Sequence, residues 1–234
     1  MADRRGLPPG RCLIYPPAPG APAELLDRFR PLGTALVSDC LDRSRGIVGA
    51  RLLLPGLVQP GRAMVGPALT VKVAPGDNLA LHQAMELITP GEVLVVDASG
   101  AIDRAIAGEI LCRLAYRRGA VGMVVDGAVR DTAAMGELPF SLFGRASIHL
   151  GPYKNGPGEI RGPVSAGGTV VQSGDIVVGD RDGVVVVPVA RAGAVLAAAE
   201  AKADDERSTL AQIEAGTYRA DWLHDAVELT WLSA

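Results

Sequence analysis

The sequence predicts an α/β fold, and the order of its apolar segments carries that prediction. Residues 92–97 form a short apolar run after a Pro-Gly turn, residues 108–118 carry an amphipathic stripe, and residues 121–125 form a second apolar run. This order predicts a strand, a helix and a second strand. A β-rich stretch follows at residues 167–189, and a long helix is predicted after it at residues 190–214.

Length, composition and charge set the broad class of protein. The chain has 234 residues, 48% of them hydrophobic, which is enough to fill the core of one sizeable domain. Its net charge of −3 does not indicate a nucleic-acid or membrane surface. The first residues lack an apolar core segment, so we expect no signal peptide, and no uninterrupted apolar run reaches membrane length. The three cysteines lack disulfide or metal-ligand spacing, which fits a reducing cytosol. Together these observations predict a soluble cytoplasmic protein that binds neither nucleic acid nor membrane.

The first part of the chain is predicted to hold an arm and two short helices. Residues 1–22 are rich in Pro, Gly and Arg, which is typical of an arm or linker rather than a core. Residues 23–29 are predicted to form the first helix. Thr34 is predicted to cap a second helix that runs through Asp42.

A further strand and helix are predicted before the central unit. Residues 66–73 alternate apolar and polar side chains, a turn follows, and Asn78 is expected to cap a helix over residues 79–88. Asp77 and Asn78 should therefore reach the same edge of the sheet as the central unit. They are either turn and cap residues or supports for a site there.

Turn signals divide the second half of the chain. The dipeptide Asp126-Gly127 is predicted to end the second central strand, and residues 133–138 are predicted to form a short helix. Residues 139–162 are rich in Gly and Pro and are expected to be a long connection, with a role as a subunit or substrate loop left open. Asp180 to Gly183 is predicted to be a tight turn between the last two strands.

These elements predict one domain with an extension at each end. We expect an N-terminal arm at residues 1–22, a single α/β domain at residues 23–216 and a C-terminal tail at residues 217–234. The tail contains Trp222 and Trp231, and it is amphipathic enough to dock on a neighbouring molecule or on the protein's own surface.

Charged residues gather at one predicted edge of the sheet. If the two central strands are parallel, the crossover helix begins beyond the carboxyl end of the first, and the second returns to that edge. Gly108-Glu109 and Arg130-Asp131 then meet where ligands of open α/β sheets usually bind. The helix start can seat a carboxylate, Arg130 can donate to an anion, and the two acids offer oxygen ligands or bases. Each charge taken alone is more simply a solvated surface residue, but their assembly favours a site.

The same residues carry a resemblance to a known family. Gly108-Glu109, followed after twenty residues by Arg130-Asp131 within DGAVRD, resembles the signature of a family with two named branches. One branch is 4-hydroxy-4-methyl-2-oxoglutarate/4-carboxy-4-hydroxy-2-oxoadipate aldolase, and the other is the regulator of ribonuclease activity A. Further blocks resemble the family in the same order: TALVSDCLDR, GPALTVKVAPGDNLALHQAM, PGEVLVVDASG and SGDIVVGDRDGVVVVP. The resemblance implies an α/β fold of the swivelling β/β/α type, an α/β/β/α sandwich with flanking helices.

The resemblance implies an activity and a set of site residues. It implies a class II aldolase that needs Mg2+ or Mn2+, cleaves a 4-hydroxy-2-oxo acid of the 4-hydroxy-4-methyl-2-oxoglutarate type to pyruvate, and decarboxylates oxaloacetate as a side reaction. Asp131 would be the metal ligand, Arg130 would stabilise the growing enolate charge, and Glu109 would be the base, directly or through a water. The substrate would be bound by Arg130 and by the helix start at Gly108, Glu109, Ile110 and Leu111.

The resemblance also implies an assembly. Members of the family resemble trimers or dimers of trimers, in which the C-terminal helix of a neighbouring subunit supplies a glutamate near the metal-bound water. The best match in this chain is Glu206, so a homotrimer or hexamer with Glu206 as a catalytic residue across the interface is implied. A solvated helix residue is the alternative for Glu206.

Two other functions compete with the metal-dependent aldolase. One is a non-catalytic binding protein that regulates a ribonuclease, as in the regulator branch of the family. The presence of Glu109, Arg130 and Asp131 argues instead for chemistry. The other is a Schiff-base aldolase, which needs a lysine of lowered pKa. Of the three lysines, Lys72 lies in a predicted strand but has no obvious partner that would lower its pKa, so this function ranks last.

Overall fold

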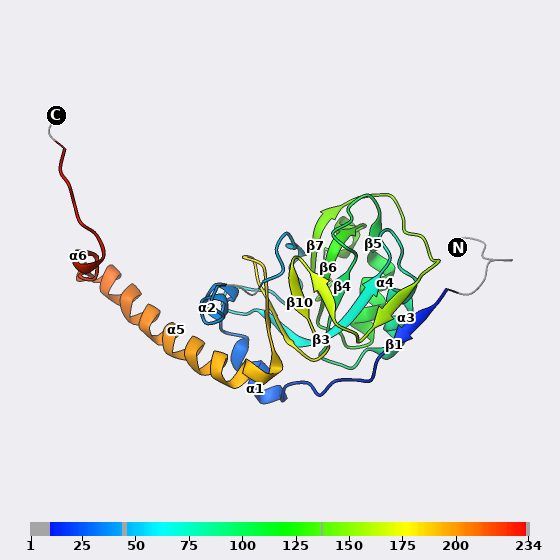
Figure 1. Ribbon diagram of the computed structural model, residues 1–234, viewed down its shortest axis with the longest axis horizontal. Helices are drawn as coiled ribbons and strands as arrows, with labels where there is room; N and C mark the ends of the chain where they lie inside the picture. The colour runs from blue at the N-terminus through cyan, green and yellow to red at the C-terminus, as the bar shows by residue number, and fades with distance from the viewer. Residues whose placement is uncertain (1–9, 44–45, 137, 233–234) are drawn as a thin grey trace.

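The computed structural model describes residues 10–43, 46–136 and 138–232, and it shows the predicted mixed α/β fold (Figure 1). The strands are β1 Cys12–Ile14, β2 Arg51–Leu54, β3 Met64–Val73, β4 Val93–Asp97, β5 Ala105–Ala107, β6 Gly122–Val129, β7 Ser141–Ser147, β8 Gly158–Ile160, β9 Val164–Ala166, β10 Thr169–Val171, β11 Ile176–Gly179 and β12 Val184–Val187. The α-helices are α1 Ala23–Phe29, α2 Thr34–Asp39, α3 Leu79–Ala84, α4 Glu109–Arg117, α5 Ala192–Glu214 and α6 Leu223–Ala226. Short 3-10 turns are η1 Met85–Leu87, η2 Thr132–Met135 and η3 Val189–Arg191.

Parallel strands form the centre of the main sheet. Its order is β1-β8-β3-β4-β6-β7-β2, with β5 paired to β6 and the hairpin β11–β12 paired to β3. Strands β3, β4, β6 and β7 run parallel to one another, and Asp97 of β4 lies opposite Asp126 of β6. The carboxyl ends of these strands therefore meet at one edge, as predicted from the strand, helix, strand order.

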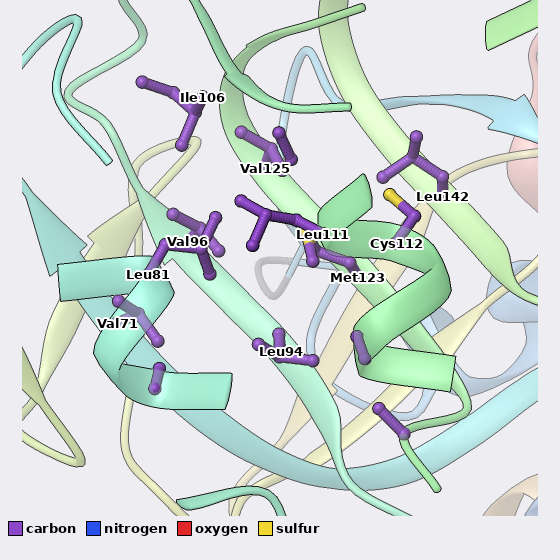
Figure 2. Close-up of a cluster of buried hydrophobic side chains, with 14 of the residues drawn as sticks. Val71, Leu81, Leu94, Val96, Ile106, Leu111, Cys112, Met123, Val125 and Leu142 are labelled. Carbon is purple, nitrogen blue, oxygen red and sulfur yellow. The ribbon is translucent and has the colours of Figure 1, made fainter. Parts of the chain in front are cut away.

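Helices α3 and α4 cover one face of this sheet. Figure 2 shows one cluster in which Leu94 and Met123 of the sheet lie with Leu81 of α3 and Leu111 of α4. Leu81, Leu94, Val96 and Met123 have no measurable exposure to solvent. Burial of one such side chain stabilises the fold by about 1.5–3 kcal/mol, so this cluster fixes α4 on the sheet.

A second β-layer and three helices build the other side. Side chains alternate along β11: Val177 packs against the main sheet, whereas Ile176 and Val178 pack toward α1, α2 and α5. The small sheet β9–β10 also packs against the main sheet, through Val164 and Val171. The layers are thus helices, main sheet, second β-layer and helices, which is the predicted α/β/β/α sandwich. The second half of α5 extends away from the layers (Figure 1).

The prediction that Asp126-Gly127 ends the second central strand was wrong. Strand β6 continues through this dipeptide to Val129. The buried Asp126 carboxylate accepts hydrogen bonds from Nε of Arg145 and from the backbone N–H of Gly167, the latter at 3.0 Å. A satisfied buried carboxylate can occupy a strand interior, so the usual turn signal of Asp-Gly does not apply here.

Two stretches predicted to lack regular structure contain strands. The expected connection at residues 139–162 includes β7, which pairs with both β6 and β2, and β8, which pairs with β3. The expected arm contributes β1, which pairs in parallel with β8, while residues 1–9 of that arm lie outside the described residues. The partners of both strands are distant in sequence, so local composition does not reveal them.

Both N-terminal helix predictions need correction at their ends. Helix α2 begins with Thr34 rather than being capped by it, and it ends at Asp39 instead of Asp42. The carboxylate of Asp180 accepts hydrogen bonds from the backbone N–H of Thr34 at 2.7 Å and from its hydroxyl at 2.6 Å. The cap therefore comes from the predicted turn at residues 180–183, across the fold.

Helix α3 is shorter than predicted, and its cap differs. It ends at Ala84 and continues as η1 to Leu87, one residue short of the predicted end. Asn78 occupies the N-cap position, but its side chain does not cap the helix; Oδ1 of Asp77 accepts the hydrogen bond from the Leu79 N–H at 2.8 Å.

The tail does not dock on the rest of its own chain within residues 218–232, which the structure describes. Trp222 is 63% and Trp231 is 89% exposed, and α6 has no buried residue. Residues 233–234 of the predicted tail lie outside the described residues. Among the described helices, none has the length and apolar composition needed to span a membrane.

Candidate active site

The structure brings Gly108, Arg130 and Asp131 together at the carboxyl edge of the sheet. Gly108 is the N-cap residue of α4, and the backbone N–H of Arg130 donates to the carbonyl of Ala107 at 3.0 Å. A Cβ atom placed on Gly108 would lie 2.6 Å from Oδ2 of Asp131 and 2.9 Å from Cγ of Arg130. A side chain at position 108 would thus occupy the space beside both charged groups, and glycine leaves that space open.

Arg130 and Asp131 contact each other and are also accessible. Nε of Arg130 lies 3.3 Å from Oδ2 of Asp131, and the two side chains are 39% and 44% exposed. A pair this exposed contributes only about 0–1 kcal/mol to stability, so a ligand can displace it at small cost. Asp131 adopts the left-handed conformation, with φ of 60°, which a non-glycine residue rarely does and which is frequent at functional sites.

The first turn of α4 presents backbone donors at the same place. The N–H of Cys112 is the first to bond within the helix, to the carbonyl of Gly108 at 3.1 Å. The N–H groups of Glu109, Ile110 and Leu111 precede it, so they have no partner inside the helix. Leu111 is anchored in the core while Ile110 is 76% exposed. The helix start is therefore fixed by packing on one side and open to an anion on the other.

Glu109 lies at the site, but its carboxylate is turned toward the helix surface. Oε1 of Glu109 accepts a hydrogen bond from Nε of Arg113, one turn later, at 2.7 Å. Arg113 also donates to the carbonyl of Ala134 at 3.4 Å. Exposed pairs at this helical spacing contribute about 0.3–0.5 kcal/mol, so rotation of Glu109 toward Asp131 costs little.

Asn78 reaches this edge of the sheet, as the sequence predicts. It is 4% exposed, and its Nδ2 donates to the carbonyl of Ile106 at 2.8 Å, two residues before Gly108. Its Oδ1 is buried and has no hydrogen-bond partner among the described residues. Buried polar atoms almost always have a partner, so this oxygen marks a position for a water, a metal ion or a ligand. Of the two roles predicted for Asn78, support for the site fits this contact, because Asp77 rather than Asn78 caps α3.

The donor groups at this edge fit a hard divalent cation. Asp131 and Glu109 each offer carboxylate oxygens. Burial, with a smaller contribution from the negative charge of Asp131, raises the pKa of the Cys112 thiol to about 12, so the thiol stays neutral and is no thiolate ligand. Within the described ranges, no three His, Cys, Asp or Glu side chains form a metal cluster. Mg2+ keeps several waters and needs one or two carboxylates, which suits this set better than Zn2+.

Glu206 is not part of this assembly within one chain. It lies on the half of α5 that extends away from the sheet (Figure 1). Its Oε1 is 3.3 Å from Nζ of Lys202, and its side chain is 51% exposed. The role of Glu206 in a neighbouring subunit's site stays a prediction.

The loop that carries Gly151, within the predicted long connection, lies against Arg130. A Cβ atom on Gly151 would be 2.9 Å from Nη1 of Arg130, so only glycine leaves this guanidinium its present place. The carbonyl of Gly151 accepts a hydrogen bond from Nη1 of Arg104 at 2.8 Å, and the hydroxyl of Tyr153 accepts one from Nη2 at 2.9 Å. Nothing in the sequence singled out Arg104, because its partners are 47 and 49 residues away.

Comparisons with known proteins agree with the resemblance seen in the sequence. A sequence profile described as RraA-like, Aldolase/RraA, matches residues 34–186. A protein of Halalkalibacterium halodurans, with the provisional name 4-hydroxy-4-methyl-2-oxoglutarate aldolase, is 42% identical over 187 residues, or 80% of this chain and 87% of that protein. The 4-hydroxy-4-methyl-2-oxoglutarate aldolase of Thermus thermophilus is 36% identical over 129 residues, or 55% of this chain and 78% of that protein.

A solved structure from the other branch is also similar. Streptomyces coelicolor RraAS2, described as an unusual member of the RNase ES inhibitor RraA protein family, is 30% identical with a TM-score of 0.72. The match covers 82% of this chain and 98% of that chain. The fold, the profile match over most of the layered domain and the identity to the Halalkalibacterium protein together show that the chain belongs to the RraA-like family of aldolases and RraA proteins.

Proposed function

We propose that this protein is a divalent-metal-dependent aldolase. It cleaves a 4-hydroxy-2-oxo acid of the 4-hydroxy-4-methyl-2-oxoglutarate type to pyruvate and a second 2-oxo acid. The observation that carries the proposal is the position of Gly108, where a Cβ would lie 2.6 Å from Asp131 Oδ2 and 2.9 Å from Arg130 Cγ, at the start of α4. The relative at 42% identity, named for this activity, supports the same substrate class.

The residues divide the work of binding and charge stabilisation. The N–H groups at the start of α4 and the positive end of the helix dipole bind the carboxylate next to the substrate carbonyl. Arg130 lies beside them and donates to the carbonyl oxygen, where negative charge grows as the C3–C4 bond breaks. A bound Mg2+ or Mn2+, held by Asp131 and by waters, would supply further positive charge to the same oxygens.

The base has to remove the proton of the 4-hydroxyl group. Glu109 is the first residue of α4, and its carboxylate leaves Arg113 at a cost of about 0.3–0.5 kcal/mol to act directly or through a water. The electrons of the O–H bond form the new carbonyl, and those of the C3–C4 bond form the pyruvate enolate, which takes a proton at C3. Decarboxylation of oxaloacetate yields the same enolate, so we propose it as a side activity.

Assembly is part of the proposal. A trimer or hexamer would bring α5 of one subunit to the site of its neighbour and place Glu206 there as an acid or base. The exposed position of Glu206 on the extended half of α5 supports this arrangement, because that half makes few contacts within its own chain.

A second candidate function is a regulator that binds a ribonuclease without catalysis. The similarity to RraAS2, which covers 98% of that chain, favours it. The two candidates differ in one respect that can be tested directly: only the aldolase needs Asp131 and a divalent cation.

One assay tests the proposal. Pyruvate release from 4-hydroxy-4-methyl-2-oxoglutarate and from oxaloacetate is measured with Mg2+ and with EDTA, for the wild type, Asp131→Ala and the control Asp27→Ala. Asp27 is a 68% exposed acid on α1, outside the site. Release that depends on Mg2+ and is lost only in Asp131→Ala supports the aldolase. No release from either substrate, together with inhibition of a ribonuclease by both variants, supports the regulator instead.

A further inference from the structure

We propose that Arg104 binds the distal carboxylate of the substrate and so restricts the site to 2-oxo dicarboxylic acids. This inference rests on the proposed function, which names the site but leaves open which group recognises the far end of the substrate. A substrate of the 4-hydroxy-2-oxoglutarate type carries a carboxylate at each end of a five-carbon chain. With one carboxylate at the start of α4, the other must reach a second cationic group nearby.

Arg104 and Arg130 lie on the two sides of one glycine. Nη1 of Arg130 would be 2.9 Å from a Cβ on Gly151, while Nη1 of Arg104 is 2.8 Å from the carbonyl oxygen of the same residue. A single residue therefore separates the two guanidinium groups. That separation matches a short dicarboxylate whose ends are bound by different arginines.

The backbone explains why the two arginines converge. Strand β5 begins directly after Arg104 and pairs in parallel with β6, which ends directly before Arg130. The side chain of Arg104 then reaches along the sheet edge to the loop that carries Gly151. The N–H of Ala105 donates to the carbonyl of Leu150 at 2.9 Å, which holds this loop beside β5.

Arg104 is held in place by neutral groups. Its guanidinium carbon lies 4.1 Å from the centre of the Tyr153 ring, and its Nη2 donates to the Tyr153 hydroxyl at 2.9 Å. Its Cδ would be 3.0 Å from a Cβ on Gly76, so the stem packs against that backbone. Such contacts immobilise the side chain before a ligand arrives, which reduces the entropy lost on binding.

Among the described residues 10–43, 46–136 and 138–232, no carboxylate forms an ion pair with the charge of Arg104. Its two hydrogen bonds use two of five guanidinium N–H donors, so a donor edge is available. By contrast, Arg113, Arg118 and Arg145 each pair with an acid of the same chain. A positioned, half-buried and unpaired guanidinium beside the site is suited to bind a carboxylate.

A purely structural role for Arg104, as a tie for the loop at residues 151–153, makes a different prediction. Loss of the tie would disturb Arg130 through Gly151 and weaken every substrate. Loss of a carboxylate-binding group weakens only substrates that carry the distal carboxylate. The ratio between two substrates of equal length therefore separates the two roles.

The experiment compares substrates that differ only at the distal end. Values of kcat/KM for pyruvate release are measured with 4-hydroxy-2-oxoglutarate and with 4-hydroxy-2-oxopentanoate, which ends in a methyl group. The variants are Arg104→Met, which keeps the packing of the stem, Arg104→Lys, which keeps the charge, and the control Arg62→Ala at an exposed turn. Thermal unfolding of each variant confirms the fold.

The expected result is a selective loss. Arg104→Met should lower kcat/KM for the dicarboxylate by about 10- to 100-fold and change it by less than about 3-fold for the monocarboxylate. Arg104→Lys should retain part of the preference, and Arg62→Ala all of it. Equal losses with both substrates, or no loss with either, would overturn the assignment.

A binding arm keeps the test independent of catalysis. Calorimetry with Mg2+ present measures the affinity for 2-oxoglutarate and for 2-oxopentanoate in the wild type and in Arg104→Met. If the wild type cleaves neither hydroxy acid, the proposed aldolase function fails, yet the affinity ratio still decides the role of Arg104. A wild-type preference for 2-oxoglutarate that Arg104→Met abolishes supports the assignment, and equal affinity for the two acids in the wild type refutes it.

Discussion

Substitution of Gly108 by alanine tests whether the space beside Arg130 and Asp131 is the active site. The new Cβ would lie 2.6 Å from Asp131 Oδ2, about 0.8 Å short of the 3.4 Å at which ordinary contact begins. It would also lie 3.2 Å from Nε of Arg130, so both charged groups must move. Because a misplacement of roughly 1 Å at a reacting centre costs about 100-fold, kcat/KM should fall by about that factor.

The fold should tolerate this change. Gly108 has φ of −156°, an extended conformation open to any residue, and the displaced side-chain ends are partly exposed. Alanine is a poorer N-cap than glycine but restricts the unfolded chain, so the free energy of unfolding should change by less than about 1 kcal/mol.

The assay is pyruvate release with Mg2+, accompanied by urea unfolding of the same samples. Gly136→Ala is the matched control, because it lies beside the site at the end of η2 and its Cβ would be 3.6 Å from the nearest atom, an ordinary contact. Normal kcat/KM in a folded Gly108→Ala protein would show that the chemistry takes place elsewhere. A comparable loss in Gly136→Ala would show that any added methyl group in this region has the same effect.

Three further predictions follow from the same geometry. Arg130→Lys should lose most of kcat, and Arg130→Ala more, because a lysine lacks the planar fork; near-normal kcat/KM in Arg130→Lys would refute this role. The Cys112 thiol has its pKa raised from 9.0 to about 12, so it should resist thiol reagents until the protein unfolds. The same shift contributes at most about 4 kcal/mol to the free energy of unfolding, which should be present below pH 9 and lost as pH rises toward 12. A Cys112→Ala variant should lack that alkaline loss. Mixed oligomers of inactive Glu206→Ala and inactive Asp131→Ala subunits should regain part of the activity, and no recovery after confirmed subunit exchange would place Glu206 outside the neighbouring site.

The sequence predicted the parts of the fold that depend on local periodicity. The strand, helix, strand unit from Val93 to Val129 follows from apolar runs separated by an amphipathic stripe, and the structure confirms it. Strand β7 was missed because glycines and prolines dominate the stretch around it, while its pairing with β2 and β6 depends on residues far along the chain. Asp126-Gly127 misled for the same reason: the partner that satisfies Asp126 is Arg145, on β7.

The candidate site was predictable where it depends on topology. Parallel strands joined by a crossover helix bring Gly108 beside Arg130 and Asp131, and this proximity depends on the backbone topology and not on side-chain conformation. The orientation of side chains was not predictable. Glu109 bonds to Arg113 instead of facing Asp131, and the partner of Arg104, Gly151, lies in a loop of irregular backbone.

The central claim is that the start of α4, Arg130 and Asp131 bind a 2-oxo acid anion together with a divalent cation. Calorimetric titration with oxalate, a planar analogue of the pyruvate enolate, measures this directly. Oxalate should bind the wild type when Mg2+ is present, fail to bind in EDTA, and lose most of its affinity in Asp131→Ala, whereas Asp27→Ala should bind it normally. Equal oxalate affinity in Mg2+ and EDTA, or unchanged affinity in Asp131→Ala, would contradict the claim.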